Sequence, residues 1–401
     1  MFDNLPLEIQ LQIIKKLPIK SLLHFRSISK TCKSQIDTSA FISHYTTSQT
    51  QTHLQKHTLV AYQEPGDINP TYISFPDDDE TFTQHKHFPT VPLLVNMLKD
   101  SVVIGTSHGL VCLYGFYSKT SMVVLWNLSI RKAVPIVVPN VGCGMYGTVV
   151  GFGVCRVTND PKIVKITYIE RESDLERISC VPWQVEVFTL STRVWRRLCN
   201  NNLPRKTIKF DWGRVGVVAD GFVYWLVVDR IMMDREYSSR NLVISFDVTT
   251  EEFREVNLPD SLANEYYYSL STSKLRESLV VLQHGVDVDN RVISVWMMED
   301  DVAKSFIKVF SVSVGTPVEA YLRGFRKSGE PILQVCENNL PIYKLIVYDP
   351  YSKQVDYLGI SGVACTFFVY PYVETLLLLD QPNLGGYNET ELIEYLDDLV
   401  S

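Results

Sequence analysis

The feature that most constrains this chain is a four-strand pattern that repeats about every 50 to 60 residues. Between residues 56 and 380, short runs rich in Val, Ile, Phe and Tyr alternate with polar turns, and apolar side chains recur at every second position. This period is typical of β-strands. Five of these runs end on a similar turn, at positions 127, 189, 247, 297 and 349. Four strands repeated at this interval predict the blades of a β-propeller.

The two ends of this region are predicted to share one blade. Five complete units leave two strands at the C-terminal end, residues 366–370 and 376–380, and two before the first unit, residues 58–62 and 71–75. Joining them removes the open edges that would otherwise remain on both sides of the array. The sequence therefore predicts six blades. The acidic segment 389–398 is expected to form a short helix that the propeller does not need.

The N-terminal residues follow a helical period instead. Ile9, Ile13 and Leu17 recur every four residues, Pro6 suits a first helical turn, and Pro18 stops this helix. Two further short helices are predicted before residue 45. A unit this small is marginal by itself, so we expect it to rest on a partner or on the next domain.

The chain is therefore expected to be α+β in two parts, a three-helix module followed by an all-β propeller. The predicted boundaries are a helical domain at 1–45, a connecting segment at 46–100 whose strands close the propeller, the propeller at 101–385, and an acidic C-terminal tail at 386–401.

Three segments of the helical module resemble the F-box. Residues 5–9 read Leu-Pro-Leu-Glu-Ile, residues 17–23 read Leu-Pro-Ile-Lys-Ser-Leu-Leu, and residues 25–30 read Phe-Arg-Ser-Ile-Ser-Lys. The resemblance runs to residue 44 and departs at Cys32, where plant F-boxes usually have tryptophan, and at Ala40, where they often have proline. The propeller region, including Gly-Thr-Ser-His-Gly-Leu-Val-Cys-Leu at 105–113, resembles the F-box-associated, kelch-related domain of plant F-box proteins.

This resemblance implies that the chain is the substrate receptor of an SCF-type (Skp-cullin-F-box) ubiquitin ligase. The helical module would bind a Skp-type adaptor and, through it, the cullin and RING subunits. Apolar residues on more than one face of so small a module also favour a partner, and the simpler alternative is that they form its own core. The residues expected to bind the adaptor are Leu5, Pro6, Glu8, Ile9, Ile13, Leu17, Pro18, Lys20, Ser21, Leu22, Leu23 and Phe25.

A substrate surface is predicted on one face of the propeller. In an antiparallel blade, the loops between the second and third strands open on the same face as the loops to the next blade. These loops are placed at 115–121, 170–184, 229–240, 283–290, 337–341 and, between blades, 261–268. Long loops on a rigid scaffold are commonly functional, and aromatic, Met and Arg side chains dominate interface energetics. The residues expected to bind substrate are Phe116, Tyr117, Arg171, Arg177, Trp183, Arg230, Met233, Arg235, Tyr237, Arg240, Tyr266 and Tyr267. The alternative for any one of them, Trp183 for example, is packing of the loop onto its blade.

Several motifs have a chemical appearance without the context that the chemistry requires. Residues 105–109 fit G-x-S-x-G and residues 142–147 fit G-x-G-x-x-G, but strands rather than helices follow both. His85 and His87 lie beside the acidic run 77–80 without further ligands at a fixed spacing, which favours a solvated loop. We therefore predict no catalytic residue, no cofactor and no metal.

Composition excludes several partners. The net charge of -7 and pI near 5.7 disfavour nucleic acid and anionic membranes. The eight cysteines are scattered, which indicates buried thiols in a reducing compartment, and no apolar run approaches the length of a membrane span. We expect a cytoplasmic or nuclear protein.

Two alternatives to the ligase receptor remain from the sequence. A propeller enzyme would need ionisable side chains on the inner strands, whereas residues 149–154 and 215–218 are apolar. An F-box scaffold acting outside any ligase has the same sequence features, so only its co-purifying partners would distinguish it.

Overall fold

The computed structural model describes most of the chain. The described residues are 7–51, 57–67, 69–76, 86–87, 91–139, 146–169, 183–199, 203–205, 207–210, 215–233, 236–287, 290–299, 305–315, 319–336, 342–364, 366–382 and 384–400. No helix among them is long and apolar enough to cross a membrane.

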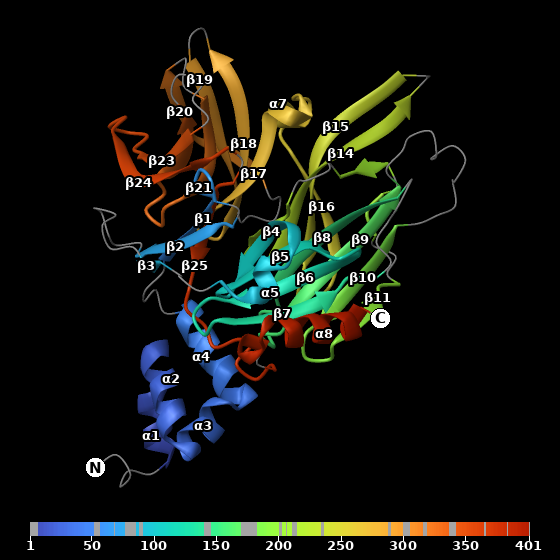
Figure 1. The fold of residues 1–401 in the computed structure, drawn as a ribbon. Helices are drawn as coiled ribbons and strands as arrows, with labels where there is room; N and C mark the ends of the chain where they lie inside the picture. Colours follow the sequence, from blue (N-terminus) through green and yellow to red (C-terminus); the bar gives the residue numbers. More distant parts are fainter. Residues whose placement is uncertain are drawn as a thin grey trace.

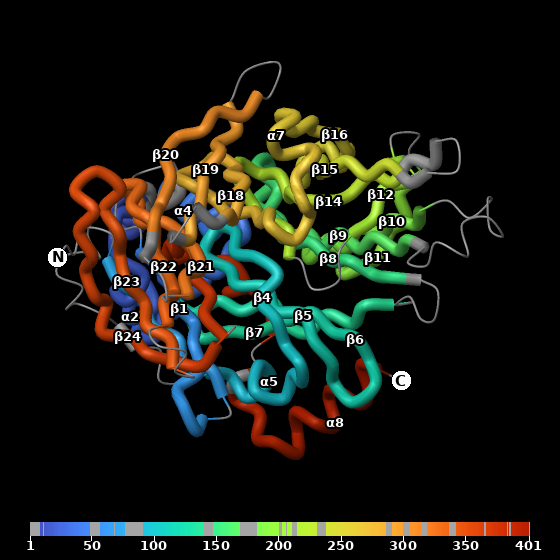
Figure 2. The backbone as a smooth tube through the Cα atoms, turned by 90° about the horizontal axis from the view of Figure 1, so that it is seen from above, coloured from blue at the N-terminus to red at the C-terminus, as the bar shows by residue number. Residues whose placement is uncertain are grey.

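Six antiparallel sheets surround a common centre and confirm the predicted six-bladed propeller (Figures 1 and 2). Blade 1 holds β4 (Lys99–Ser107), β5 (Leu110–Tyr117), β6 (Thr120–Asn127) and β7 (Lys132–Val137). Blade 2 holds β8 (Tyr146–Val154), β9 (Pro161–Ile169), β10 (Gln184–Thr189) and β11 (Val194–Arg197). Blade 3 holds β12 (Ile208–Lys209), β13 (Val217–Ala219), β14 (Phe222–Met233), β15 (Glu236–Asp247) and β16 (Phe253–Asn257). Blade 4 holds β17 (Leu270–Leu275), β18 (Ser278–Asp287), β19 (Asn290–Met298) and β20 (Phe306–Gly315), and blade 5 holds β21 (Glu319–Phe325), β22 (Pro331–Cys336), β23 (Ile342–Tyr348) and β24 (Val355–Val363).

Both ends of the chain contribute to blade 6, as predicted, but in a different proportion. Its strand order is β25 (Phe368–Tyr372), β1 (His57–Tyr62), β2 (Thr71–Pro76) and β3 (Lys86–His87), so the C-terminal end supplies one strand instead of two. The predicted strand at 376–380 is wrong. Residues 377–380 form a turn, because side chains of blade 1 bind its backbone: Asn127 Nδ2 donates to the Leu377 carbonyl at 2.7 Å and Lys132 Nζ to the Leu379 carbonyl at 2.7 Å.

Tight hairpins connect β4 to β5 in blade 1 and β13 to β14 in blade 3. His108 and Gly109 have φ of 48° and 79°, and Asp220 and Gly221 have φ of 42° and 72°, as a type I′ turn requires. A Cβ on Gly109 would lie 2.1 Å from the Val373 carbonyl oxygen, so only glycine fits there. The G-x-S-x-G segment is therefore a hairpin turn and no nucleophile elbow.

The helical module lies at the bottom of Figure 1, against one face of the propeller. It contains α1 (Leu7–Ile14), α2 (Ile19–Ile28) and α3 (Lys30–Ile36), and α4 (Ser39–Gln51) continues past residue 45 toward the propeller. One hydrophobic cluster joins Phe41 and Tyr45 of α4 to Val154 of blade 2 and Leu376 before the C-terminal turn. The module and the propeller therefore share a continuous core.

The C-terminal tail, which we expected to be removable, packs against the propeller. It forms α8 (Glu389–Val400), which lies along blade 1 and buries Leu392 and Leu396 in the same cluster as Trp126. Covering an edge with a helix protects it from pairing with another chain. The remaining short helices are α5 (Leu93–Asn96), α7 (Asp260–Ala263), η2 (Tyr267–Ser269) and η3 (Leu384–Gly386).

Candidate adaptor and substrate surfaces

Helices α1 and α2 expose an apolar surface of the helical module. Ile9 and Ile13, one helical turn apart on α1, are 44% and 41% exposed. Ile28, the last residue of α2, is 65% exposed and was absent from the predicted adaptor residues. Large apolar side chains with this exposure on neighbouring helices are typical of a surface that a partner covers.

The other predicted adaptor residues divide into core and surface. Leu22 is fully buried and belongs to the module core, so it cannot contact a partner, and the prediction is wrong for this residue. Leu17, Leu23 and Phe25 are half-buried against the same core. Pro18 and Lys20 are exposed and Ser21 is half-buried. Leu5 and Pro6 lie outside the described residues, as does the side chain of Glu8.

Two local contacts hold this surface in shape. Ser29 caps α3 by accepting a hydrogen bond from the Cys32 amide at 3.2 Å, which fixes the corner between α2 and α3. Arg26 of α2 binds both carboxylate oxygens of Asp37, with Nε–Oδ1 and Nη2–Oδ2 distances of 2.5 and 3.0 Å. A bidentate pair of this kind fixes geometry as well as adding attraction.

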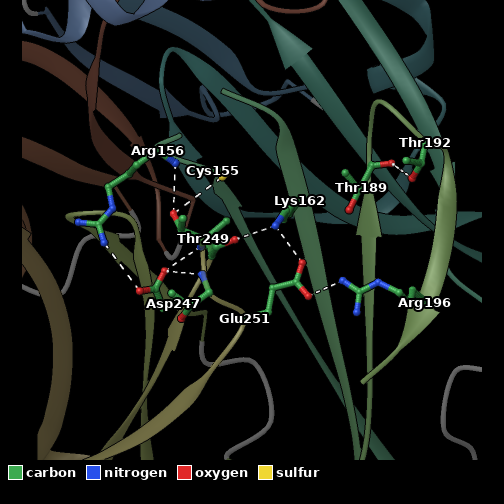
Figure 3. Close-up of polar contacts among 11 residues, drawn as sticks. Cys155, Arg156, Lys162, Thr189, Thr192, Arg196, Asp247, Thr249 and Glu251 are labelled. Atoms are coloured by element: carbon green, nitrogen blue, oxygen red, sulfur yellow. Dashed lines mark hydrogen bonds and ion pairs between the residues drawn. The ribbon is translucent and has the colours of Figure 1, made fainter. Parts of the chain in front are cut away.

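The face of the propeller toward the helices carries the turns between first and second strands. Asn159, in the β8–β9 turn, binds Ser43 and Thr47 of α4. A polar network ties this face across blades 2 and 3 (Figure 3). Lys162 Nζ lies 2.8 Å from Glu251 Oε1, and Arg196 pairs with the other oxygen of the same carboxylate. Burial alone would raise the pKa of Glu251, but the hydrogen bonds and positive charges of these two residues hold that pKa below its ordinary value.

The opposite face carries the predicted substrate loops, and three of these loops are hairpins in the structure. The β5–β6, β14–β15 and β18–β19 ladders continue to Tyr117–Thr120, Met233–Glu236 and Asp287–Asn290, respectively. The β14–β15 hairpin projects away from the helices in Figure 1. The strands extend to the tips because each added cross-strand pair stabilises the ladder. The polar composition of these segments predicts loops instead. Residues 170–182 and 337–341 lie outside the described residues.

Three predicted substrate residues serve the fold. Trp183 is buried between Tyr168 and Phe210 in the core shared by blades 2 and 3, so the substrate prediction for it is wrong. Tyr117 donates its hydroxyl to Asp397 of α8 at 3.0 Å. Tyr267 donates to the Leu226 carbonyl at 3.1 Å.

The remaining predicted substrate residues are exposed or lie outside the description. Phe116 is 38% and Tyr266 68% exposed, and Arg230 is exposed on β14. Arg240 forms an exposed ion pair with Asp260 of α7 at 3.0 Å. Arg171, Arg177 and Arg235 lie outside the described residues, and so do the side chains of Met233 and Tyr237.

The propeller encloses a central channel of about 1030 Å³, whose charged wall the sequence did not predict. Strands β4, β13, β17, β21 and β25 line it, together with residues of β1, β18 and β19. Of the two runs expected to be apolar inner strands, residues 215–218 line the channel, and residues 149–154 are not among its lining residues. The expectation did not extend to β17 and β21, which bring Lys274 and Arg323 to the wall. In β21, Tyr321 and Arg323 alternate with the buried residues Ala320, Leu322 and Gly324, and this alternation in the sequence is a signal that could have revealed the charged wall.

The channel does not assemble a metal site from the described residues. No three His, Cys, Asp or Glu side chains come together there or elsewhere in the part of the chain that the structure covers. A serine and a histidine do meet, with Ser271 Oγ and His284 Nε2 3.0 Å apart on neighbouring strands. This pair adds hydrogen-bonding groups to the wall.

Comparisons with known proteins agree with this architecture. Residues 2–44 match the model of the F-box domain, and residues 97–378 match that of the F-box associated beta propeller domain. The F-box protein CPR1 of Arabidopsis thaliana is 24% identical over 94% of this chain and 89% of its own length. The F-box/kelch-repeat protein At3g23880 of the same plant is 25% identical over 77% of this chain and 78% of its own. The match to the propeller model alone covers more than half of the chain. The chain therefore belongs to the F-box proteins that carry an F-box associated β-propeller domain.

Proposed function

We propose that this protein is the substrate-recognition subunit of an SCF-type ubiquitin ligase. Its α1–α2 surface binds a Skp-type adaptor and, through it, cullin and RING subunits, and its propeller binds the target protein. The F-box, the propeller domain and the F-box relatives support a receptor role in such a complex. The eight scattered cysteines indicate thiols in a reducing compartment, which agrees with a cytoplasmic or nuclear place of action.

The observation that carries this proposal is the placement of the two surfaces. The exposed isoleucines of α1 and α2 lie on a module that is fixed by a continuous core to one face of the propeller. The other face of the propeller points away from that module (Figure 1). A receptor built this way holds its target at a fixed distance from the ligase scaffold, which raises the effective concentration of target lysines.

The experiment that tests the adaptor surface replaces Ile9 and Ile13 together by aspartate. The double variant should lose the adaptor in a pull-down and retain the melting temperature, since both side chains are already exposed. Val355→Asp, which changes a 52% exposed residue on the outermost strand of blade 5, is the matched control and should bind normally. Unchanged adaptor binding by the double variant would contradict the proposal.

Two other functions are separated from this one by simple measurements. A scaffold outside any ligase would retain the adaptor but not cullin when the intact protein is purified from cells. A propeller enzyme would turn over a small molecule without either subunit. The proposed role is non-catalytic and requires both adaptor and cullin. It also requires a target protein, which should accumulate in cells when the Ile9→Asp, Ile13→Asp double variant replaces the natural protein.

A further inference from the structure

The central channel has a charge opposite to that of the chain. The protein carries a formal charge of -7, yet six lysines and arginines and one glutamate are among the described residues that line the channel. Low-dielectric walls lined by one sign of charge focus the field and concentrate ligands of the other sign. The cations are Lys274, Arg276, Arg291, Arg323, Arg326 and Lys327.

Among these cations, the position of Arg323 is fixed by a β-bulge and by two side-chain contacts. It is the extra residue of a β-bulge, where the β21–β22 register shifts between Leu322 and Gly324, and bulges redirect side chains next to binding sites. Its Nε donates to Oε1 of the buried Gln334 at 2.6 Å, and its guanidinium lies 5.4 Å from the centre of the Tyr321 ring. Both of these partners are neutral. They hold the guanidinium in place.

The cations around Arg323 are only partly neutralised. Lys274 pairs with Glu277 at 2.8 Å, although this carboxylate is 63% exposed. Arg326 and Arg291 lie 3.3 and 4.0 Å from Glu330 and Glu319, respectively. For Arg276 and Lys327, the described residues provide no ion-pair partner. These two cations therefore add positive charge to the channel that no described carboxylate neutralises.

Aromatic side chains accompany these charges. Tyr268 is 63% exposed and Tyr321 37% exposed, and both line the channel. Arginine and tyrosine are the residue types that dominate binding energy at protein interfaces. A volume of about 1030 Å³ accommodates several side chains of a peptide, which is far more than one phosphate or carboxylate needs.

We propose that the channel binds an anionic segment of the target protein, rich in Asp and Glu or phosphorylated. Arg323 binds its carboxylate or phosphate groups, to which the planar guanidinium fork is matched, and Tyr268 and Tyr321 pack against neighbouring residues of the segment. The net charge of -7 on the whole chain disfavours nucleic acid as the ligand. This inference rests on the proposed receptor function and specifies the chemistry of its target.

The test uses the full chain bound to its adaptor and three pools of short fluorescent peptides. The pools have identical randomised flanks around a central run of glutamate, phosphoserine or glutamine. We expect the complex to retain at least one of the two anionic pools over the glutamine pool. Arg323→Gln should weaken this binding about tenfold or more, since close charge pairs at interfaces contribute that much. The stronger of the two anionic pools identifies the source of the charge.

A charge-matched control separates a local site from general attraction. Arg254→Gln removes the same charge from an exposed position on β16, at the outer edge of blade 3, and should change binding less than twofold. Equal retention of all three pools, or equal losses from Arg323→Gln and Arg254→Gln, would overturn the inference. Adaptor binding is measured on the same samples, so a failed channel site leaves the proposed function intact. Loss of adaptor binding by the natural chain would instead contradict the function itself.

Discussion

Asn159 of the propeller and Ser43 of the helical module are joined by a hydrogen bond of 2.8 Å between Nδ2 and Oγ. The same amide group donates to Thr47 Oγ1 at 2.9 Å. Asn159 adopts a left-handed φ of 54° in the β8–β9 turn, a conformation that asparagine tolerates better than most residues. Asn159 thus has two roles: its backbone forms the turn, and its side chain joins the propeller to the helical module. The junction sets the position of the channel relative to the adaptor surface.

Replacing Asn159 by glycine should destabilise the protein without disturbing the turn. Glycine accepts the left-handed backbone but removes the amide and leaves the two hydroxyl partners without this donor. We expect a loss of about 1 to 3 kcal/mol in the free energy of unfolding. Asn159→Asp, which keeps the shape but cannot donate, should be at least as unstable. Urea denaturation measures both, and an unchanged midpoint for Asn159→Gly would show that the contact does not hold the junction.

Removal of residues 364–401 should prevent the propeller from closing. The deletion takes away β25, which pairs with β1 from Phe368 to Tyr372, and leaves an inner edge unpaired. Unpaired strand edges recruit other chains, so the truncated protein should aggregate. Size-exclusion chromatography and light scattering test this outcome. A monomer that still melts cooperatively would mean that the ring is stable while open.

The C-terminal helix should contribute to stability through two leucines. Leu392 and Leu396 are 1% and 0% exposed, so replacing both by alanine leaves cavities against blade 1. Each buried leucine removed costs about 2 to 5 kcal/mol. Ile393→Ala, on the same helix at 37% exposure, is the control and should have a small effect. Similar melting temperatures for the double variant and the control would show that α8 is only loosely attached.

His108 should make the protein less stable in mild acid. Burial, helped by the positive charge of Lys274, lowers the pKa of His108 from 6.5 to about 4. Below pH 6.5 the His108 imidazole therefore binds a proton in the unfolded chain, whereas in the folded chain it stays neutral until about pH 4. Stability is lost as the pH falls through this window, by about 3 kcal/mol at most, and the loss is complete below it.

The variant His108→Asn isolates this contribution. Asparagine tolerates the φ of 48° at this position and does not titrate. The free energy of unfolding of the variant should fall less steeply between pH 7 and pH 4 than that of the natural protein. Parallel pH profiles for the two proteins would assign the acid sensitivity to other groups, such as the carboxylate of Glu251, whose lowered pKa acts in the same direction.

The sequence by itself determined the architecture. Alternating apolar residues predict the strands, Asp220-Gly221 and His108-Gly109 predict hairpins that need positive φ at both positions, and the four-residue period predicts the helices. These features depend on a few neighbouring residues and on the local geometry of the backbone, so they can be recognised before the chain is folded. The exposed isoleucines of α1 were found for the same reason.

Only the tertiary structure decided which of these residues face a partner. Leu22 and Trp183 are residue types that are common at binding surfaces, yet both are buried. Leu377 lies in a run that predicts a strand, but a hydrogen bond from Asn127 holds it in a turn. The orientation of the Arg323 side chain depends on a β-bulge and on Gln334 of the next strand. Such outcomes arise from contacts between segments far apart in the sequence, where packing and hydrogen-bond satisfaction override local preference. The channel exists only because six blades close into a ring, and no single segment encodes it.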